Sequence, residues 1–229
     1  MTEQVLNISG RNCHIISVGD NPSAVIVKPL GEFEWRLLKE ECCLIAERTT
    51  LPFTMVAFEV NEDDLRPQGA ENTFNYLKDS LIPYILQSIP HEYVVIGGYS
   101  LGGLFALWSA TKLDGIDAVF AGSPSLWMDG WDEYAAKHPV KAKFVYMSLG
   151  NKEECTKKQP FCKVGDRVRQ QHQLHLSQLG EQNCILEWNE GGHFADIEQR
   201  KARGFAWCLE RVNNMTNGQL TICLPNAKL

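Results

Sequence analysis

The chain has 229 residues, of which 44% are apolar, and its 22 Lys and Arg against 28 Asp and Glu give a net charge of -6. This apolar fraction supports a substantial core, and the length suits one large α/β domain, so we expect a single domain over residues 1–229. Neither sign of charge gathers into a long block, which argues against nucleic acid or an anionic membrane surface as a partner.

Predicted strands and helices alternate along most of the chain. Two β-rich pieces at 4–8 and 13–18, separated by a polar turn with a glycine, predict an opening hairpin. Later β-rich apolar runs predict strands at 24–27, 53–60, 93–96, 118–121, 143–149 and 183–188. Apolar residues at helical intervals predict helices at 32–48, 71–89, 101–112, 162–179 and 194–212. The alternation predicts three αβα layers around a twisted, mostly parallel sheet of about seven to eight strands.

Three features fall outside this simple alternation. The polar segment 61–69 predicts a loop, and 122–131 predicts a long loop rich in aromatic residues. Pro83 lies inside the helical pattern of 71–89, so we expect a kink or a new first turn there. No apolar run is long enough to span a bilayer, and the N-terminal residues lack the pattern of a signal peptide, so we expect a cytoplasmic protein.

Gly98, Ser100 and Gly102 form a glycine-x-serine-x-glycine motif between the strand at 93–96 and the helix at 101–112. In this context the motif is typical of a nucleophile elbow, in which a serine lies on a strained turn above a sheet. A Cβ at either glycine would collide with the neighbouring strand or helix. Chance alone would give the bare motif about 0.08 times in a chain of this length. The alternative is a closely packed turn without chemistry.

A serine hydroxyl needs a base to take its proton, and His193 is the one histidine of six that directly follows a predicted strand. His172 and His175 have a spacing that could clasp a metal ion on a helix. No nearby carboxylate completes such a site, so we interpret this pair as a solvated helix face. The sequence therefore predicts His193 as general base and neither a metal nor a cofactor.

The base in turn needs a carboxylate, and Glu153 and Glu154 follow the strand at 143–149. Adjacent loop residues point in different directions, so only one of them should reach His193. Asp129 and Asp196 are weaker candidates, because Asp196 suits the N-terminal cap of the next helix. The order serine, acid, histidine is the one that α/β-hydrolases use.

Acyl transfer also needs two backbone donors for the oxyanion. The amide of Leu101, directly after the serine, is the first. The second should come from the turn after the strand at 24–27, and because Pro29 has no N–H, Leu30 or Gly31 must supply it. We assign Leu30.

Four segments in order carry a family resemblance: Gly-Tyr-Ser-Leu-Gly-Gly at 98–103, Gly-Ser-Pro-Ser-Leu-Trp at 122–127, Leu-Gly-Asn-Lys-Glu-Glu at 149–154 and Gly-Gly-His-Phe at 191–194. Together they resemble the putative esterase family of α/β-hydrolases, which includes esterase D type enzymes and enterochelin esterases. The similarity covers roughly residues 20 to 212. It implies a compact α/β-hydrolase fold with little or no lid.

The resemblance also implies roles for individual residues. Ser100 would be the nucleophile and His193 the base, and the spacing after Gly150 favours Glu153 over Glu154 as the acid. The implied activity is hydrolysis of a small-molecule carboxylic ester or thioester through an acyl-enzyme. An acyltransferase with the same triad and a catalytically silent binding module remain the alternatives.

The same relatives wall their active site with the serine-proline-serine-aromatic loop. By this likeness Ser123, Trp127 and Trp131 would line the substrate pocket, with core packing as the alternative for Trp131. Tyr99, beside the nucleophile, and Arg66, in the loop at 61–69, are placed in the pocket as well.

Overall fold

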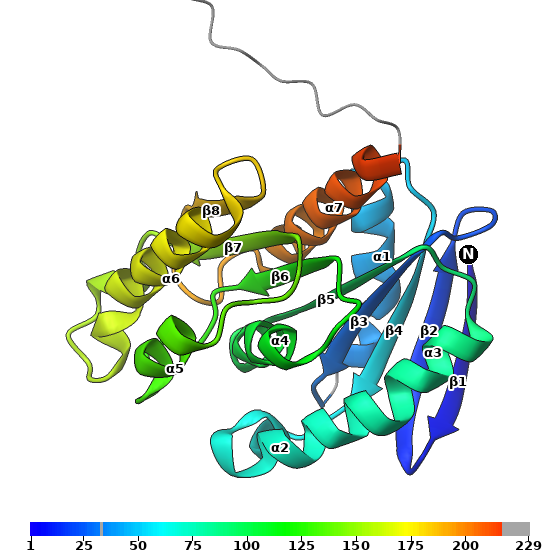
Figure 1. Ribbon diagram of the computed structural model, residues 1–229, viewed down its shortest axis with the longest axis horizontal. Helices are drawn as coiled ribbons and strands as arrows, with labels where there is room; N and C mark the ends of the chain where they lie inside the picture. The colour runs from blue at the N-terminus through cyan, green and yellow to red at the C-terminus, as the bar shows by residue number, and fades with distance from the viewer. Residues whose placement is uncertain (33, 217–229) are drawn as a thin grey trace, which may run out of the picture.

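An eight-stranded sheet runs through the computed structural model, which describes residues 1–32 and 34–216 (Figure 1). The strand order is β1-β2-β4-β3-β5-β6-β7-β8. The strands are β1 (Thr2–Ile8), β2 (Arg11–Val18), β3 (Ala24–Leu30), β4 (Phe53–Glu59), β5 (Tyr93–Tyr99), β6 (Ala118–Gly122), β7 (Phe144–Gly150) and β8 (Cys184–Asn189). Strand β2 pairs antiparallel with β1 and β4, and the other pairings are parallel, as the sequence predicts.

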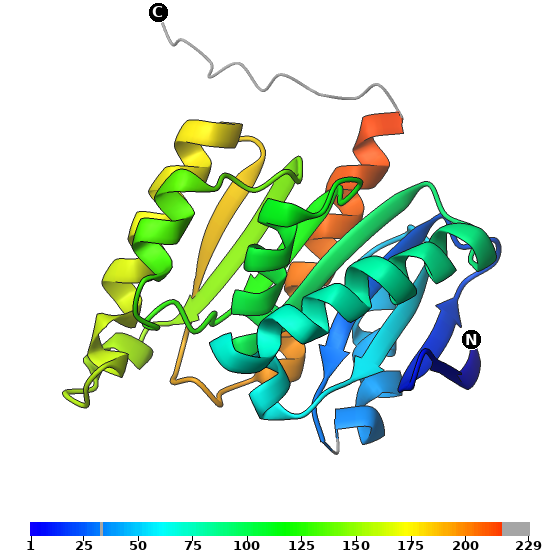
Figure 2. The ribbon, with the colours of Figure 1, turned by 60° about the horizontal axis from the view of Figure 1, so that its bottom comes forward.

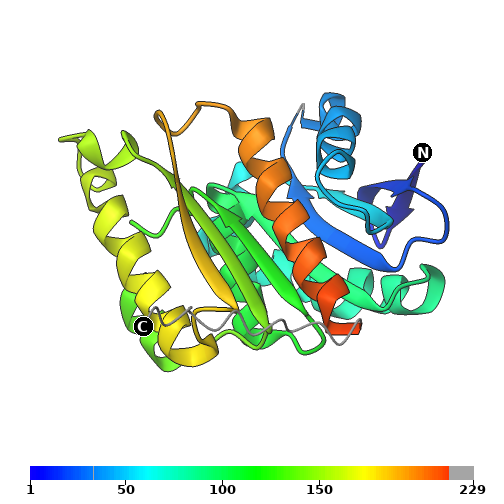
Figure 3. The ribbon, with the colours of Figure 1, turned by 90° about the horizontal axis from the view of Figure 1, so that it is seen from above.

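Helices cover both faces of this sheet. They are α1 (Leu38–Ala46), α2 (Pro67–Tyr76), α3 (Ile82–Ser88), α4 (Leu101–Lys112), α5 (Trp131–Lys137), α6 (Val164–Leu179) and α7 (Ile197–Thr216). Figure 2 shows α2, α3 and α4 on one face, and Figure 3 shows α7 and α1 on the other. The three αβα layers that the sequence predicts are confirmed. Residues 217–229 of the predicted domain lie outside the described residues.

Two apolar layers form the core because the central strands are buried on both sides. In β3, Val25 and Val27 pack with α2 to α6, whereas Ala24 and Ile26 pack with α1 and α7. Successive residues of a strand point to opposite faces, so a strand between two helix layers is apolar throughout. The parallel arrangement brings the loops after β5, β7 and β8 to one edge of the sheet.

The structure differs from the two predicted loops and confirms the expectation at Pro83. The segment 61–69 is not a loop: a 3₁₀ helix spans Glu62–Leu65 and α2 begins at Pro67, a residue that suits the first helical turn. Pro83 lies in the first turn of α3, after a π-helical turn at Leu77–Leu81, so the expected new first turn is confirmed. The predicted loop at 122–131 gives way at its end to α5, whose first turn holds two acidic residues.

The histidine pair on α6 does not form a solvated face. His175 is fully buried where α6 packs against the sheet and α5, and its Nε2 lies 3.1 Å from the Gln171 amide nitrogen. Burial, with a smaller effect of His172, lowers the pKa of His175 to about 4. Among the residues that the structure describes, no group of three or more His, Cys, Asp or Glu side chains could hold a metal ion. Within the same residues, no helix has both the length and the apolar character to cross a membrane.

A buried ion cluster joins the end of β3 to α1 and α7. The Glu41 carboxylate accepts hydrogen bonds from Lys28 Nζ at 3.1 and 2.8 Å, and Lys201 Nζ lies 3.0 Å from its Oε2. All three side chains are about 2% exposed. Burial alone would raise the pKa of Glu41, but the two lysines outweigh it and lower the pKa to about 2. Glu41 is therefore ionised and holds two buried cations.

We expect Glu41→Ala to lower the free energy of unfolding by about 3–5 kcal/mol, because it leaves Lys28 and Lys201 buried without this partner. Urea denaturation measures the change. The matched control is Glu40→Ala, an exposed carboxylate on the same helix, which should cost about 0.5 kcal/mol or less. Equal losses for the two variants would contradict the stabilising role of the cluster.

Candidate active site

Ser100 lies on a sharp turn between β5 and α4. Its backbone has φ 57° and ψ -118°, a strained conformation for a residue other than glycine. A Cβ at Gly98 would come within 2.6 Å of the Gly102 backbone, so the turn needs glycine there. At Gly102 the nearest atom is Pro29 Cγ at 3.2 Å, a milder restriction. The turn has the geometry of a nucleophile elbow, and it aims the Ser100 side chain at the loop after β8.

His193 lies in that loop, and its two ring nitrogens face two different partners. Nε2 lies 3.1 Å from Ser100 Oγ, and Nδ1 lies 2.8 Å from Glu153 Oε2. The Tyr99 hydroxyl donates a hydrogen bond of 2.7 Å to the His193 carbonyl, which fixes the loop beside the elbow. These contacts bring together the serine, the histidine and one of the two candidate acids.

Glu153 follows β7 and has a side chain that is only 6% exposed. Its Oε1 accepts hydrogen bonds from Ser123 Oγ at 2.6 Å and from the Gly150 amide at 2.8 Å. Burial alone would raise the pKa of this carboxyl, but the hydrogen bonds from His193, Ser123 and Gly150 outweigh it and lower the pKa below its ordinary value. Glu153 is therefore a carboxylate at neutral pH.

Glu154 points away from the histidine. Its carboxylate accepts hydrogen bonds of 2.7 and 2.8 Å from the Arg169 guanidinium on α6. That pairing lowers the pKa of Glu154. Of the two adjacent glutamates, the structure brings Glu153 to His193 and leaves Glu154 on a surface ion pair.

Arg200 is a residue of this site that the sequence does not indicate. Its side chain is fully buried, with Nη2 bonded to Ser123 Oγ and 3.3 Å from Glu153 Oε1. The guanidinium also lies over the Tyr99 ring, 5.2 Å from the ring centre. An arginine in a helical sequence pattern is usually expected on the exposed face. Only the folded structure shows that Arg200 is buried beside the Glu153 carboxylate.

The two residues predicted as oxyanion donors, Leu101 and Leu30, lie in different surroundings. Leu101 is the first residue of α4, and the first amides of a helix have no partner within it. Leu30 is buried in β3 and lines neither pocket at Ser100, and its carbonyl accepts a hydrogen bond from the Val60 amide. The neighbouring Gly31 does border the pocket of Ser100, and its amide donates to Glu34 Oε2 at 2.6 Å.

Two pockets meet at Ser100 and His193, with volumes of about 600 and 560 Å³. The second is bordered by Ser123, Trp127 and Arg66, three of the residues that we expect in the substrate pocket. Tyr99 borders the first. Ser123 is 1% exposed, and its hydroxyl donates to Glu153 and accepts from Arg200, so it lies between these two side chains.

Trp131 lines neither of these pockets. It borders a third, apolar pocket between α4 and α5, together with Trp108. The core-packing alternative holds in part, because Trp131 is 8% exposed and its Nε1 donates to Gln171.

The sheet order, the elbow after β5, and the placement of Glu153 after β7 and His193 after β8 define the fold as that of an α/β-hydrolase. The chain belongs to the putative esterase family, whose model matches residues 56–196. That range includes Ser100, Glu153 and His193, but it does not include the turn at Lys28–Gly31. Membership supports a hydrolase that acts on esters.

Solved structures share the fold at low sequence identity. Siderophore hydrolase EstB from Aspergillus nidulans is 16% identical, with a TM-score of 0.67 over 90% of this chain and 93% of that one. The enterobactin esterase FES from Shigella flexneri is 15% identical, with a TM-score of 0.68 over 93% of this chain and 60% of that one. The esterase Pf2001 from Pyrococcus furiosus is 15% identical, with a TM-score of 0.58 over 92% of each chain. No curated protein matches the sequence directly.

Proposed function

We propose that this protein is a serine hydrolase that cleaves carboxylic esters or thioesters of small molecules through an acyl-enzyme on Ser100. The observation that carries the proposal is the continuous hydrogen-bonded series from Ser100 Oγ through His193 to Glu153, with contacts of 3.1 and 2.8 Å. Such a series activates a hydroxyl that is otherwise a poor nucleophile.

In the first half-reaction, Ser100 Oγ attacks the carbonyl carbon of the ester while His193 Nε2 takes the hydroxyl proton. The tetrahedral intermediate then expels the alcohol oxygen, which leaves with that proton, and the acyl group stays on Ser100. In the second, water attacks the acyl-enzyme and gives a proton to His193. Collapse of the second intermediate returns that proton to Ser100 Oγ and releases the carboxylic acid.

Residues around Ser100 and His193 can stabilise the two charges that form during these steps, the imidazolium and the oxyanion. Glu153, held as a carboxylate, accepts a hydrogen bond from Nδ1–H and stabilises the imidazolium that forms. We assign the amide of Leu101 as an oxyanion donor, because it lies at the start of α4, where the helix dipole also favours negative charge.

Active-site labelling tests the proposal. The protein should react with a fluorophosphonate probe at Ser100, identified by peptide mapping, and should turn over p-nitrophenyl acetate. Preincubation with the probe should abolish that turnover. Absence of both labelling and turnover in the folded protein would contradict the proposal and favour the binding-module alternative.

The natural substrate is then sought with a panel of acyl esters, thioesters and siderophore esters that compete with the probe. Siderophore esters belong in it because EstB and FES, which share the fold, are a siderophore hydrolase and an enterobactin esterase. Addition of alcohols and amines tests the acyltransferase alternative, since an acceptor-dependent product would reveal transfer. The cytoplasmic location stays a prediction.

A further inference from the structure

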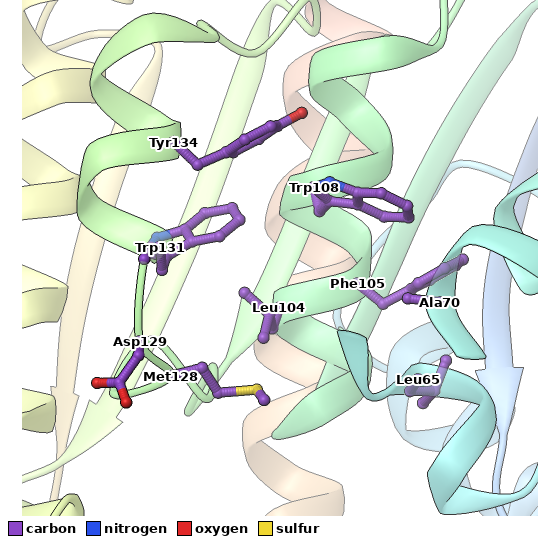
Figure 4. Close-up of a pocket in the computed structure, with 10 residues that line it drawn as sticks. Leu65, Ala70, Leu104, Phe105, Trp108, Met128, Asp129, Trp131 and Tyr134 are labelled. Atoms are coloured by element: carbon purple, nitrogen blue, oxygen red, sulfur yellow. The ribbon is translucent and has the colours of Figure 1, made fainter. Parts of the chain in front are cut away.

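We propose that the apolar pocket between α2, α4 and α5 binds the hydrocarbon part of the substrate's acyl group. This inference rests on the proposed function and names a substrate class for it: esters of acids with an apolar chain, rather than acetyl esters. Figure 4 shows the pocket, with Leu104 and Trp108 projecting from α4 opposite Trp131 and Tyr134 of α5. Leu65 and Met128 also line it.

Most side chains that line the pocket are apolar, although Trp108, Trp131 and Tyr134 each carry one polar atom. Trp131 Nε1 donates a hydrogen bond of 2.9 Å to Gln171 Oε1, and the Tyr134 hydroxyl lies 2.8 Å from Thr111 Oγ1. The polar atoms of Trp131 and Tyr134 therefore have hydrogen-bond partners outside the lining. The Asp129 carboxylate points away from the other lining side chains (Figure 4). A hydrocarbon chain could enter this space without breaking either of these two hydrogen bonds, and it would lie against mostly apolar side chains.

The pocket lies close to the nucleophile. Leu65 borders both this pocket and the one that contains Ser100. The Leu104 amide donates to the Ser100 carbonyl at 3.1 Å, so this wall begins one helical turn from the nucleophile. On the other side, the Met128 amide donates to the Ser125 carbonyl at 3.2 Å, and Ser125 Oγ lies 3.4 Å from Ser100 Oγ. A chain attached to an acyl carbon at Ser100 therefore has an apolar space beside it.

The volume of the pocket suits one part of a small molecule. The pocket holds about 270 Å³, against about 600 and 560 Å³ for the two pockets that meet at Ser100. Sites that enclose a whole small molecule usually have about 300–1,000 Å³. We therefore assign the small apolar pocket to the acyl chain and the larger, more polar pockets to the alcohol part of the ester. Each methylene group buried there should raise kcat/KM about fourfold, which is about 0.8 kcal/mol at 25 °C.

Hydrolysis of p-nitrophenyl acetate, butanoate and hexanoate tests the assignment, because the leaving group stays constant. In the wild type, kcat/KM for hexanoate should exceed that for acetate at least about tenfold. Ala70→Phe projects a ring into the pocket from α2 and should lower this ratio at least about tenfold. Met128→Ala, which enlarges the pocket, should instead shift the preference towards longer chains. Ala136→Phe, on the exposed side of α5, is the matched control and should leave the ratio unchanged.

The possible outcomes separate this inference from the proposed function. Failure of the wild type to hydrolyse any of the three esters contradicts the proposed function. Hydrolysis without chain-length preference, or a preference that neither Ala70→Phe nor Met128→Ala alters, contradicts only the acyl pocket. Light scattering measures the oligomeric state of the wild type and of Ala70→Phe. If the wild type is a dimer and Ala70→Phe is a monomer, a second copy of the chain covers the pocket, and the assignment to the acyl chain is overturned. Thermal unfolding verifies that each variant is folded under assay conditions.

Discussion

Ser100→Ala should lower kcat for p-nitrophenyl acetate by about 10⁴- to 10⁶-fold, the largest loss that we expect from any substitution. The reason is that no acyl-enzyme can form without the hydroxyl that lies 3.1 Å from His193 Nε2. Residual hydrolysis above the uncatalysed rate should remain, because oxyanion donors and substrate contacts survive the change. Steady-state kinetics, with active-site titration of the wild type, gives the measurement.

A second serine beside the nucleophile provides the control. Ser125 is buried and its hydroxyl lies 3.4 Å from that of Ser100. Ser125→Ala should cost less than about tenfold in kcat, the size of effect expected for one neutral hydrogen bond. Two results would contradict Ser100 as the nucleophile and with it the proposed mechanism. One is a loss of kcat for Ser125→Ala as large as that for Ser100→Ala, and the other is labelling of Ser125 by the fluorophosphonate probe.

The sequence predicts well those features that depend on local pattern. Apolar periodicity sets the strands and helices, and the glycine spacing around Ser100 requires the turn that the structure shows. His193 is found because it follows a strand, and the parallel sheet places such loops at one edge. These predictions need only neighbouring residues and the rules of sheet topology.

Features that depend on packing between distant segments are not readable from the pattern. The burial of His175 and of Arg200 depends on which helix faces meet the sheet and the loops. The sequence predicts that the strand ends at residue 27, whereas β3 extends to Leu30, so the role of Leu30 as second oxyanion donor stays a prediction. In the same way, the direction of the Glu153 and Glu154 side chains after a sharp turn cannot be read from the residue pattern, and only the family resemblance favours Glu153.

Replacing that acid gives the second large effect. Glu153→Gln should lower kcat by about 10⁴-fold, the loss seen when the acid of a serine triad is exchanged for its amide. The amide keeps the shape of the carboxylate, but it carries no charge to stabilise the imidazolium and can hold His193 in the wrong tautomer. KM should change little, because Glu153 acts through the histidine as a positioning residue. Full progress curves for p-nitrophenyl acetate separate the two constants.

The adjacent glutamate, Glu154, provides a matched control for this prediction. Glu154→Gln removes the same charge one residue away, but it breaks only the exposed pair with Arg169, so kcat should stay within about twofold. Glu153→Gln also deprives the buried Arg200 of its carboxylate partner, so its folding must be verified by thermal unfolding before rates are compared. A folded Glu153→Gln variant with near wild-type kcat, or a large loss in Glu154→Gln, would show that the hydrogen bond between Glu153 and His193 does not serve catalysis.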